Sequence, residues 1–127
     1  MASIDVVDEL FVVAAPEVVA AEFAGPGRWR QLWPDLDLEV VTDRGLQGMR
    51  WTTAGALVGS MEVWLEPVLD GTLLHYYLRA DLPPGCRGGH RRLVAERRRR
   101  QRAAKALAFA IKDRLEAGRA PGVTPSG

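Results

Sequence analysis

Two alternating segments on either side of Asp70-Gly71 constrain the fold of this chain more than any other feature. An Asp-Gly pair between segments such as 57–68 and 72–82 is the strongest short-range signal for a β-hairpin. With Asp70 and Gly71 as the two loop residues, one face is apolar: Leu65 pairs with Tyr76, Val63 with Leu78 and Met61 with Ala80. The other face pairs charges and aromatic rings: Glu66 with His75, Trp64 with Tyr77 and Glu62 with Arg79. A slip of one residue would mix the two faces, so the pattern predicts this register.

Three more strands and a short helical region precede the hairpin. Residues 4–13 are rich in Val, Ile and Phe and predict a first strand, and residues 37–42 and 48–54 alternate as two further strands. Pro16 suits the first position of a short helix over 16–24, which Gly25-Pro26-Gly27 should stop. Residues 28–36 then form a short helical turn or loop.

A long helix over residues 91–117 follows the sheet. Its apolar stripe has helical spacing and comprises Ala104, Leu107, Ala108, Ile111 and Leu115. Gly118 and Pro121 end the helix. We therefore expect a single domain over 1–117 and a flexible tail over 118–127.

The chain of 127 residues has ordinary globular composition, with 47% apolar and 26% charged residues. One cysteine and two histidines exclude a disulfide framework and cannot alone fill a structural zinc site, and we expect no cofactor. No apolar run of membrane-spanning length occurs, and the acidic N-terminal segment differs from a secretory signal, so we expect a cytoplasmic protein.

Charge is divided unevenly along the chain. Residues 1–81 hold 13 acidic and 5 basic residues, whereas residues 82–127 hold 3 acidic and 12 basic residues. The two parts, at −8 and +9, can neutralise each other within one fold, or the basic part can bind an anionic partner. Nucleic acid is not expected, because no aromatic residue for base stacking lies between Arg87 and Lys105. A weak contact with an anionic membrane stays open.

Three local phrases, in their order along the chain, resemble a known superfamily. They are VVAAPEVV at 12–19, the segment from Trp29 to Trp33-Pro34, and LEPVLDGT at 65–72. Over about residues 4–117 the chain resembles the START-like, polyketide cyclase/dehydrase (SRPBCC) superfamily. The resemblance implies an α+β helix-grip fold: a curved antiparallel sheet of about five strands around a long C-terminal helix, with short helices after the first strand. Members usually have six or seven strands, so the five counted here predict a smaller cavity and an open edge that a second copy could cover.

The fold that the resemblance implies places a ligand between the sheet and the C-terminal helix. The inward faces proposed above supply candidate ligand-binding residues, with Trp33 near the entrance: Trp33, Met49, Trp51, Met61, Leu65 and Tyr76. The alternative is that these side chains form the core.

Two arginines interrupt the apolar stripe of the long helix. Traced backward from Ala104, the stripe reaches Arg100, Arg97 and Leu93. Either the first half of the helix overhangs the sheet, or Arg97 and Arg100 lie at the cavity mouth and bind a carboxylate or phosphate.

No catalytic set is evident, and we identify no catalytic residue. Cys86 and His90 lie in a glycine loop without an orienting third residue, which leaves Tyr76, or Glu62 in another register, as acid–base candidates. The first hypothesis is therefore binding or transport of a small hydrophobic, or anionic, molecule. The second is a cyclase/dehydrase-type enzyme. The third is an interaction module that binds proteins or a second copy through the basic helix and the outer face around Trp64 and Tyr77.

Overall fold

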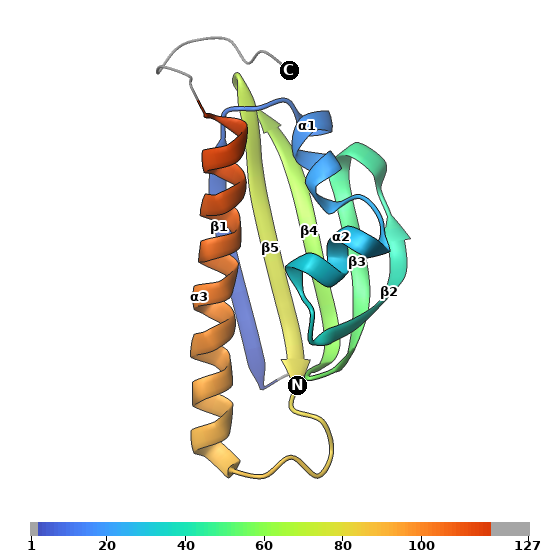
Figure 1. Cartoon of the computed structure of the whole chain (residues 1–127), viewed down its shortest axis with the longest axis vertical. Helices are drawn as coiled ribbons and strands as arrows, with labels where there is room; N and C mark the ends of the chain where they lie inside the picture. The colour runs from blue at the N-terminus through green and yellow to red at the C-terminus, as the bar shows by residue number, and fades with distance from the viewer. Residues whose placement is uncertain (1–2, 118–127) are drawn as a thin grey trace.

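The computed structural model describes residues 3–117 and contains one open antiparallel sheet (Figure 1). The sheet has the strand order β1-β5-β4-β3-β2. Its strands are β1 (Ile4–Val12), β2 (Leu36–Asp43), β3 (Gly48–Gly55), β4 (Val58–Val68) and β5 (Gly71–Asp81). The predicted α+β helix-grip arrangement of five strands and a long C-terminal helix is confirmed. Residues 118–127, for which we expect a flexible tail, lie outside the described residues.

The helical elements lie over one face of the sheet (Figure 1). They are α1 (Pro16–Ala20), η1 (Ala21–Phe23), α2 (Pro26–Leu32) and α3 (Gly89–Leu115), while the short turn η2 (Gly45–Gln47) joins β2 to β3. The helix predicted over 16–24 is thus divided into α1 and η1, and Gly25, with a φ of 84°, ends it. The prediction that Pro26 helps to stop this helix is only partly correct, since Gly25 already ends it. Pro26 begins α2, because the first position of a helix needs no backbone N–H.

The register of the β4–β5 hairpin differs from the prediction by two residues. Val68 pairs with Gly71, so the loop residues are Leu69 and Asp70, and the observed pairs include Leu65 with Leu74 and Trp64 with His75. Gly71 lies in the strand because β1 passes close to it: a Cβ there would be 2.3 Å from the Val12 carbonyl oxygen. Leu69 takes the left-handed conformation that the turn requires, with a φ of 53°. A shift of two residues leaves every side chain on its predicted face.

Helix α3 packs mainly against β1 and is fixed to the rest of the molecule by charged contacts. Its own residues Ala104, Ala108 and Ile111 are buried. Lys105 pairs with Asp8 at 2.5 Å, and Arg114 pairs with Glu22. Acidic residues of the first part of the chain therefore neutralise basic residues of the last part within the fold, the first of the two alternatives above.

Candidate functional site

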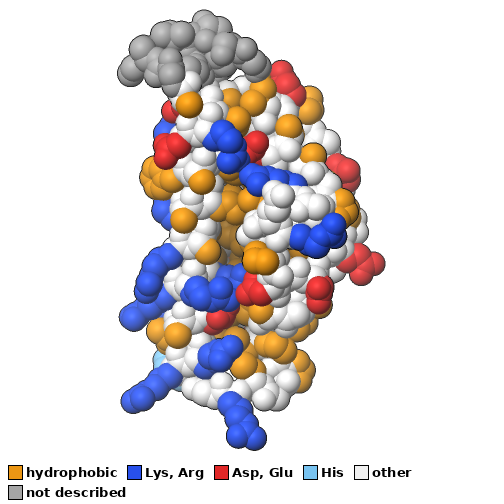
Figure 2. Space-filling model, in the orientation of Figure 1, with side chains coloured by type: hydrophobic (Ala, Val, Ile, Leu, Met, Phe, Trp, Pro, Cys, Tyr) orange, Lys and Arg blue, Asp and Glu red, His pale blue; other side chains and the backbone are white. Residues whose placement is uncertain are grey.

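The space between the sheet and α3 is filled by aromatic side chains. Trp33 stacks on Phe23 at a ring-centroid distance of 6.3 Å and on Tyr76 at 6.4 Å, and it meets Trp51 at 5.5 Å. Figure 2 shows hydrophobic side chains on the floor of the narrow furrow between α3 and the α1–α2 segment. The gap beneath this furrow has a volume of only about 10 Å³. It holds at most one water molecule, so the interior is a packed core.

A larger pocket lies beside this core, between the α1–η1 segment and the η2–β3 segment. We call it the side pocket, and its volume is about 380 Å³. Met49 and Leu65, two of the predicted ligand-binding residues, line it together with Ala20 and Phe23. Its lining also contains two carboxylates, those of Glu17 and Asp43.

Glycine and aspartate shape the rim of the side pocket. A Cβ at Gly48 would lie 2.0 Å from the Val63 carbonyl oxygen, so only glycine lets β3 begin this close to β4. The Asp43 side chain accepts a hydrogen bond of 2.8 Å from the Gly45 N–H and thereby holds the turn η2 against the pocket. Within residues 3–117, neither Glu17 nor Asp43 forms an ion pair, so both charges face solvent or a bound molecule.

Phe23 separates the side pocket from the core. Its ring lines the side pocket and also the small gap that contains Trp33 and Tyr76. The Phe23 carbonyl accepts a hydrogen bond of 2.6 Å from Trp29 Nε1, which ties η1 to α2. One aromatic ring thus divides the single cavity that the sequence predicted into a pocket and a filled interior.

The predicted ligand-binding residues are therefore divided between two places: Trp33, Trp51, Met61 and Tyr76 contact one another in the packed core, and the other two line the side pocket. Met49 and Leu65 reach the side pocket, whereas Trp33 and Tyr76 lie behind Phe23. Trp51 and Met61 line neither space and are fully buried.

Arg100 lies in the interior and binds carboxylates of the chain itself. Its guanidinium donates to both oxygens of Asp35, at 3.2 and 2.6 Å, and to Glu96 at 3.0 Å. Arg99 bridges the same two carboxylates, at 2.9 Å to Asp35 and 2.7 Å to Glu96. We call these four residues the Arg100 cluster. Arg97, the other predicted anion-binding residue, is exposed and lies outside the buried row of α3.

The electrostatics of the Arg100 cluster keep both acids charged. Burial alone would raise the pKa of Asp35 and of Glu96. Hydrogen bonds from Arg99 and Arg100 outweigh burial and lower the pKa of each carboxyl below its usual value. The same bonds raise the pKa of Arg99. Two carboxylates of the chain itself thus bind Arg100, where one of the alternatives above expected an anionic ligand.

Two buried polar atoms on β3 stand out in the core. Among residues 3–117, Trp51 Nε1 and Thr53 Oγ1 are buried without a hydrogen-bond partner. Trp51 is fully buried and Thr53 is 4% exposed. Unpaired buried polar groups reduce stability, so this inward face of β3 is suboptimal for folding alone.

The remaining candidates give no catalytic arrangement. The Tyr76 hydroxyl donates to Met61 Sδ at 3.3 Å, and burial raises the pKa of this phenol above its usual value. Cys86 is exposed in the loop before α3, and His90, which was expected in the same loop, is exposed in the first turn of α3. Within residues 3–117, no group of three or more His, Cys, Asp or Glu residues is placed to hold a metal ion. No helix in this part of the chain is long and apolar enough to cross a membrane.

Comparisons with known proteins find similarity in structure but not in sequence. No family model and no curated protein matches the chain. A structural-genomics target from Deinococcus radiodurans matches with a TM-score of 0.66 and 14% identity, over 90% of this chain and 98% of the target. The Aha1 dimer structure from Colwellia psychrerythraea matches with a TM-score of 0.60 and 14% identity, over 92% and 99%.

A biosynthetic protein has the same fold. The di-domain ARO/CYC StfQ from the steffimycin biosynthetic pathway matches with a TM-score of 0.58 and 16% identity, over 87% of this chain and 51% of StfQ. The fold that the resemblance implied is thereby confirmed, and the chain is a five-stranded helix-grip protein.

Proposed function

We propose that this protein binds a small, largely apolar molecule in the side pocket and catalyses no reaction on it. The observation that carries this proposal is the pocket itself: about 380 Å³, with a largely apolar lining that includes Phe23. This volume lies within the range of about 300–1,000 Å³ that is usual for small-molecule sites. Phe23 is also the wall of the core, so a ligand that displaces its ring gains access to the gap next to Trp33 and Tyr76.

The charge of the side pocket favours a neutral or cationic ligand. Glu17 and Asp43 contribute two carboxylates to its lining, and no cation of residues 3–117 neutralises them. Of the two arginines considered for an anionic ligand, Arg100 is already bound by Asp35 and Glu96, and Arg97 is exposed away from the pocket lining. A small hydrophobic amine, or a neutral apolar molecule with a hydrogen-bond donor, fits these charges better than a carboxylic acid.

A cyclase/dehydrase-type function, the main alternative, has less support. The di-domain ARO/CYC StfQ shares the fold at 16% identity, and a shared fold alone does not carry a reaction. Proton transfer needs an acid or base that reaches the substrate. Tyr76 lies behind Phe23 with its hydroxyl directed at Met61, and burial raises the pKa of this phenol, which makes it a weaker acid.

Binding of matched probes tests the proposal. We would titrate the ¹⁵N-labelled protein with benzylamine, toluene and benzoate, which share a ring and differ in charge. Benzylamine and toluene should shift the amide signals of Leu46 and Gly48 in a saturable way, and benzoate should bind more weakly. The variant Ala24→Leu places extra bulk in the pocket lining and should weaken binding at least tenfold. Ala54→Leu adds the same bulk at an exposed position of β3 and is the control.

Two results would contradict this proposal. The first is unchanged probe affinity in Ala24→Leu. The second is a preference for benzoate over benzylamine, which would locate binding at a basic surface instead. Native mass spectrometry of gently purified protein would then identify a natural ligand as a discrete mass that is lost on denaturation.

A further inference from the structure

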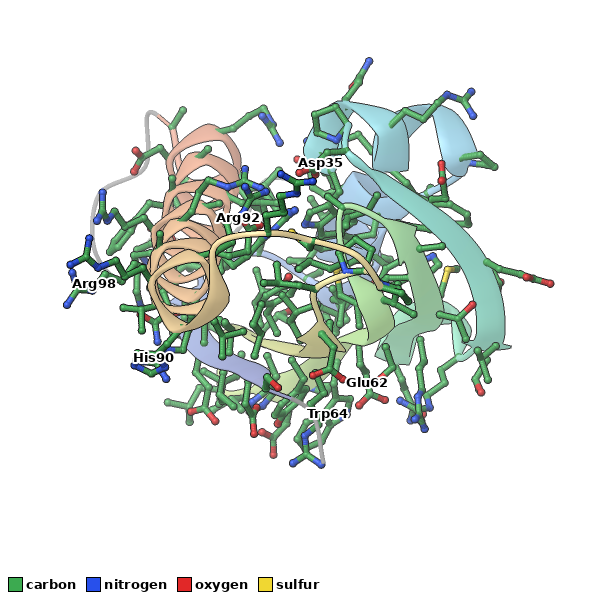
Figure 3. The ribbon with its side chains drawn as sticks, turned by 90° about the horizontal axis from the view of Figure 1, so that it is seen from below. Asp35, Glu62, Trp64, His90, Arg92 and Arg98 are labelled. Atoms are coloured by element: carbon green, nitrogen blue, oxygen red, sulfur yellow. The ribbon has the colours of Figure 1, made fainter. Side chains whose placement is uncertain are left out.

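The face of the sheet that is turned away from the helices is uncovered by any described element. Figure 3 shows Trp64 and Glu62 on this outer face, on the opposite side of the sheet from Asp35 and α3. The register places Val7 beside Tyr77 and Trp64 beside His75, so these four side chains share the same face. Met49 and Leu65 belong to the other face, so the outer face is separate from the side pocket.

The centre of the outer face is a rigid aromatic platform. The Trp64 ring stacks on His75 at 4.3 Å, and His75 is parallel to Tyr77 at 6.3 Å. His75 is held from both sides, by Glu9 at 3.2 Å and by Glu66 at 3.1 Å, and it is only 5% exposed. Trp64 remains 37% exposed and Val7 59% exposed. The side chains are thus ordered, and they present apolar surface to the outside.

Charged residues of opposite sign lie at the two ends of this platform. Glu66 lies toward the hairpin loop, in the row of the β4–β5 pair two residues before His75. Two residues beyond Tyr77, in the other direction, lies Arg79. Arg79 borders a surface depression of about 310 Å³, together with Arg50, Ser60 and Tyr77.

The basic end of the outer face lacks a strong partner within residues 3–117. Arg50 forms no ion pair there, and Arg79 approaches Asp5 only at 3.9 Å between exposed side chains. Glu62, the acid at the depression, is already paired with Arg44. The depression therefore has room and positive charge for a carboxylate that comes from outside.

We infer that a second copy of this chain packs on the outer face, around a two-fold axis that lies in the interface and runs perpendicular to the strands. This axis reverses the strand direction, so Arg79 of each copy faces Glu66 of the other, and the two aromatic platforms meet in the middle. Charge complementarity selects this arrangement, because an axis parallel to the strands would place Arg79 against Arg79. The partner's Glu66 keeps the contact of one carboxylate oxygen with its own His75 and presents the other, exposed oxygen to Arg79 at the edge of the depression.

The size of the outer face is sufficient for a stable dimer. The five strands lie about 4.8 Å apart and have 9, 8, 8, 11 and 11 residues at about 3.4 Å each. With their mean length, the face is about 24 Å by 32 Å, or about 770 Å². Standard protein interfaces bury about 800 Å² on each partner. Two sheets can pack with their strands about 30° apart, which long arginine and glutamate side chains accommodate.

Charge reversal with exchange tests this dimer. Sedimentation velocity of the whole chain should show a dimer, and Arg79→Glu and Glu66→Arg should each raise the dimer dissociation constant at least about tenfold. Each single variant places like charges at both symmetric contacts. An equal mixture of the two variants should form a heterodimer with nearly the affinity of the original protein, because every contact is then again between opposite charges.

The control variant is Arg98→Glu, which reverses an exposed arginine on the outer side of α3 (Figure 3). It should leave the dimer unchanged. Far-UV circular dichroism and thermal melts of each variant check that folding is intact. The inference is overturned by a monomer at high micromolar concentration. A dimer that resists both reversals, or a mixture that stays monomeric, also overturns it. None of these results affects probe binding in the side pocket.

Discussion

Replacing Asp35 with asparagine removes the charge that pairs with both terminal nitrogens of the buried Arg100 guanidinium. Removal of one partner from a buried ion pair costs about 3–5 kcal/mol, whereas an exposed pair contributes about 1 kcal/mol or less. The Asp35 side chain is 37% exposed, so water replaces part of the lost interaction. Glu96 still accepts from Arg100. The loss in unfolding free energy should therefore be about 2 kcal/mol.

Differential scanning calorimetry measures this loss as a shift in Tm. A domain of 127 residues has an unfolding entropy of about 0.27 kcal/mol/K, from about 2.1 cal/mol/K for each residue. A loss of about 2 kcal/mol then lowers Tm by about 7 °C. Asp37→Asn is the control, because Asp37 is an exposed acid two residues away, in β2, and has no ion pair within residues 3–117. It should change Tm by less than about 2 °C.

A double variant separates the cost of an unpaired charge from a loss of packing. Adding Arg100→Met to Asp35→Asn removes the buried charge and keeps a long apolar side chain in its place. The double variant should recover at least half of the lost stability, since an apolar replacement of a buried ion pair is often neutral. The reasoning is refuted if Asp35→Asn melts like Asp37→Asn, or if the double variant is the least stable of the three.

Three further outcomes are expected. The pKa values of Asp35 and Glu96 are lowered in the folded protein, so these charges stabilise it fully above their unfolded-state pKa values, near pH 4. This stabilisation is lost as the pH falls through the lower folded-state values. Acid denaturation should therefore reduce the stability of Asp35→Asn less steeply than that of the original protein. Thr53→Val removes an unpaired buried hydroxyl, so urea denaturation should show equal or higher stability, and a loss above about 1 kcal/mol would contradict this. Phe23→Ala should lower the free energy of unfolding by about 3–4 kcal/mol and join the side pocket to the core gap, so toluene should bind more tightly. Phe109→Ala, at a 45% exposed position, is the control and should change neither the stability nor the affinity for toluene much.

The alternation of the hairpin was sufficient to predict faces but not pairs. Side chains alternate with a period of two, so the observed register and the predicted register, which differ by two residues, bury the same residues. The difference is decided by β1, whose Val12 carbonyl leaves space only for glycine at position 71. This contact joins residues far apart in the sequence, which a local pattern does not contain.

The candidate site was predicted in part for a similar reason. Met49 and Leu65 face the side pocket as the alternation indicated. The position of Phe23 between two spaces depends on how the first helical region folds back over the sheet, which a local pattern does not contain. Glu96 was missed because glutamate usually lies on a solvated helix face. Its spacing of four residues from Arg100 was a signal that could have placed both residues on the buried side.

The two halves of α3 are attached in different ways, and this predicts a sequence of opening. Toward its C-terminal end the helix buries Ala104, Ala108 and Ile111 in the core, in addition to the ion pairs of Lys105 and Arg114. Toward its N-terminal end it is held by the salt links of Glu96, Arg99 and Arg100. Native-state hydrogen exchange should therefore show the first half opening as a cooperative unit of lower free energy than global unfolding, and more readily as ionic strength increases. Local unfolding would then release the N-terminal half of the helix from the sheet while the C-terminal half stays packed on the core.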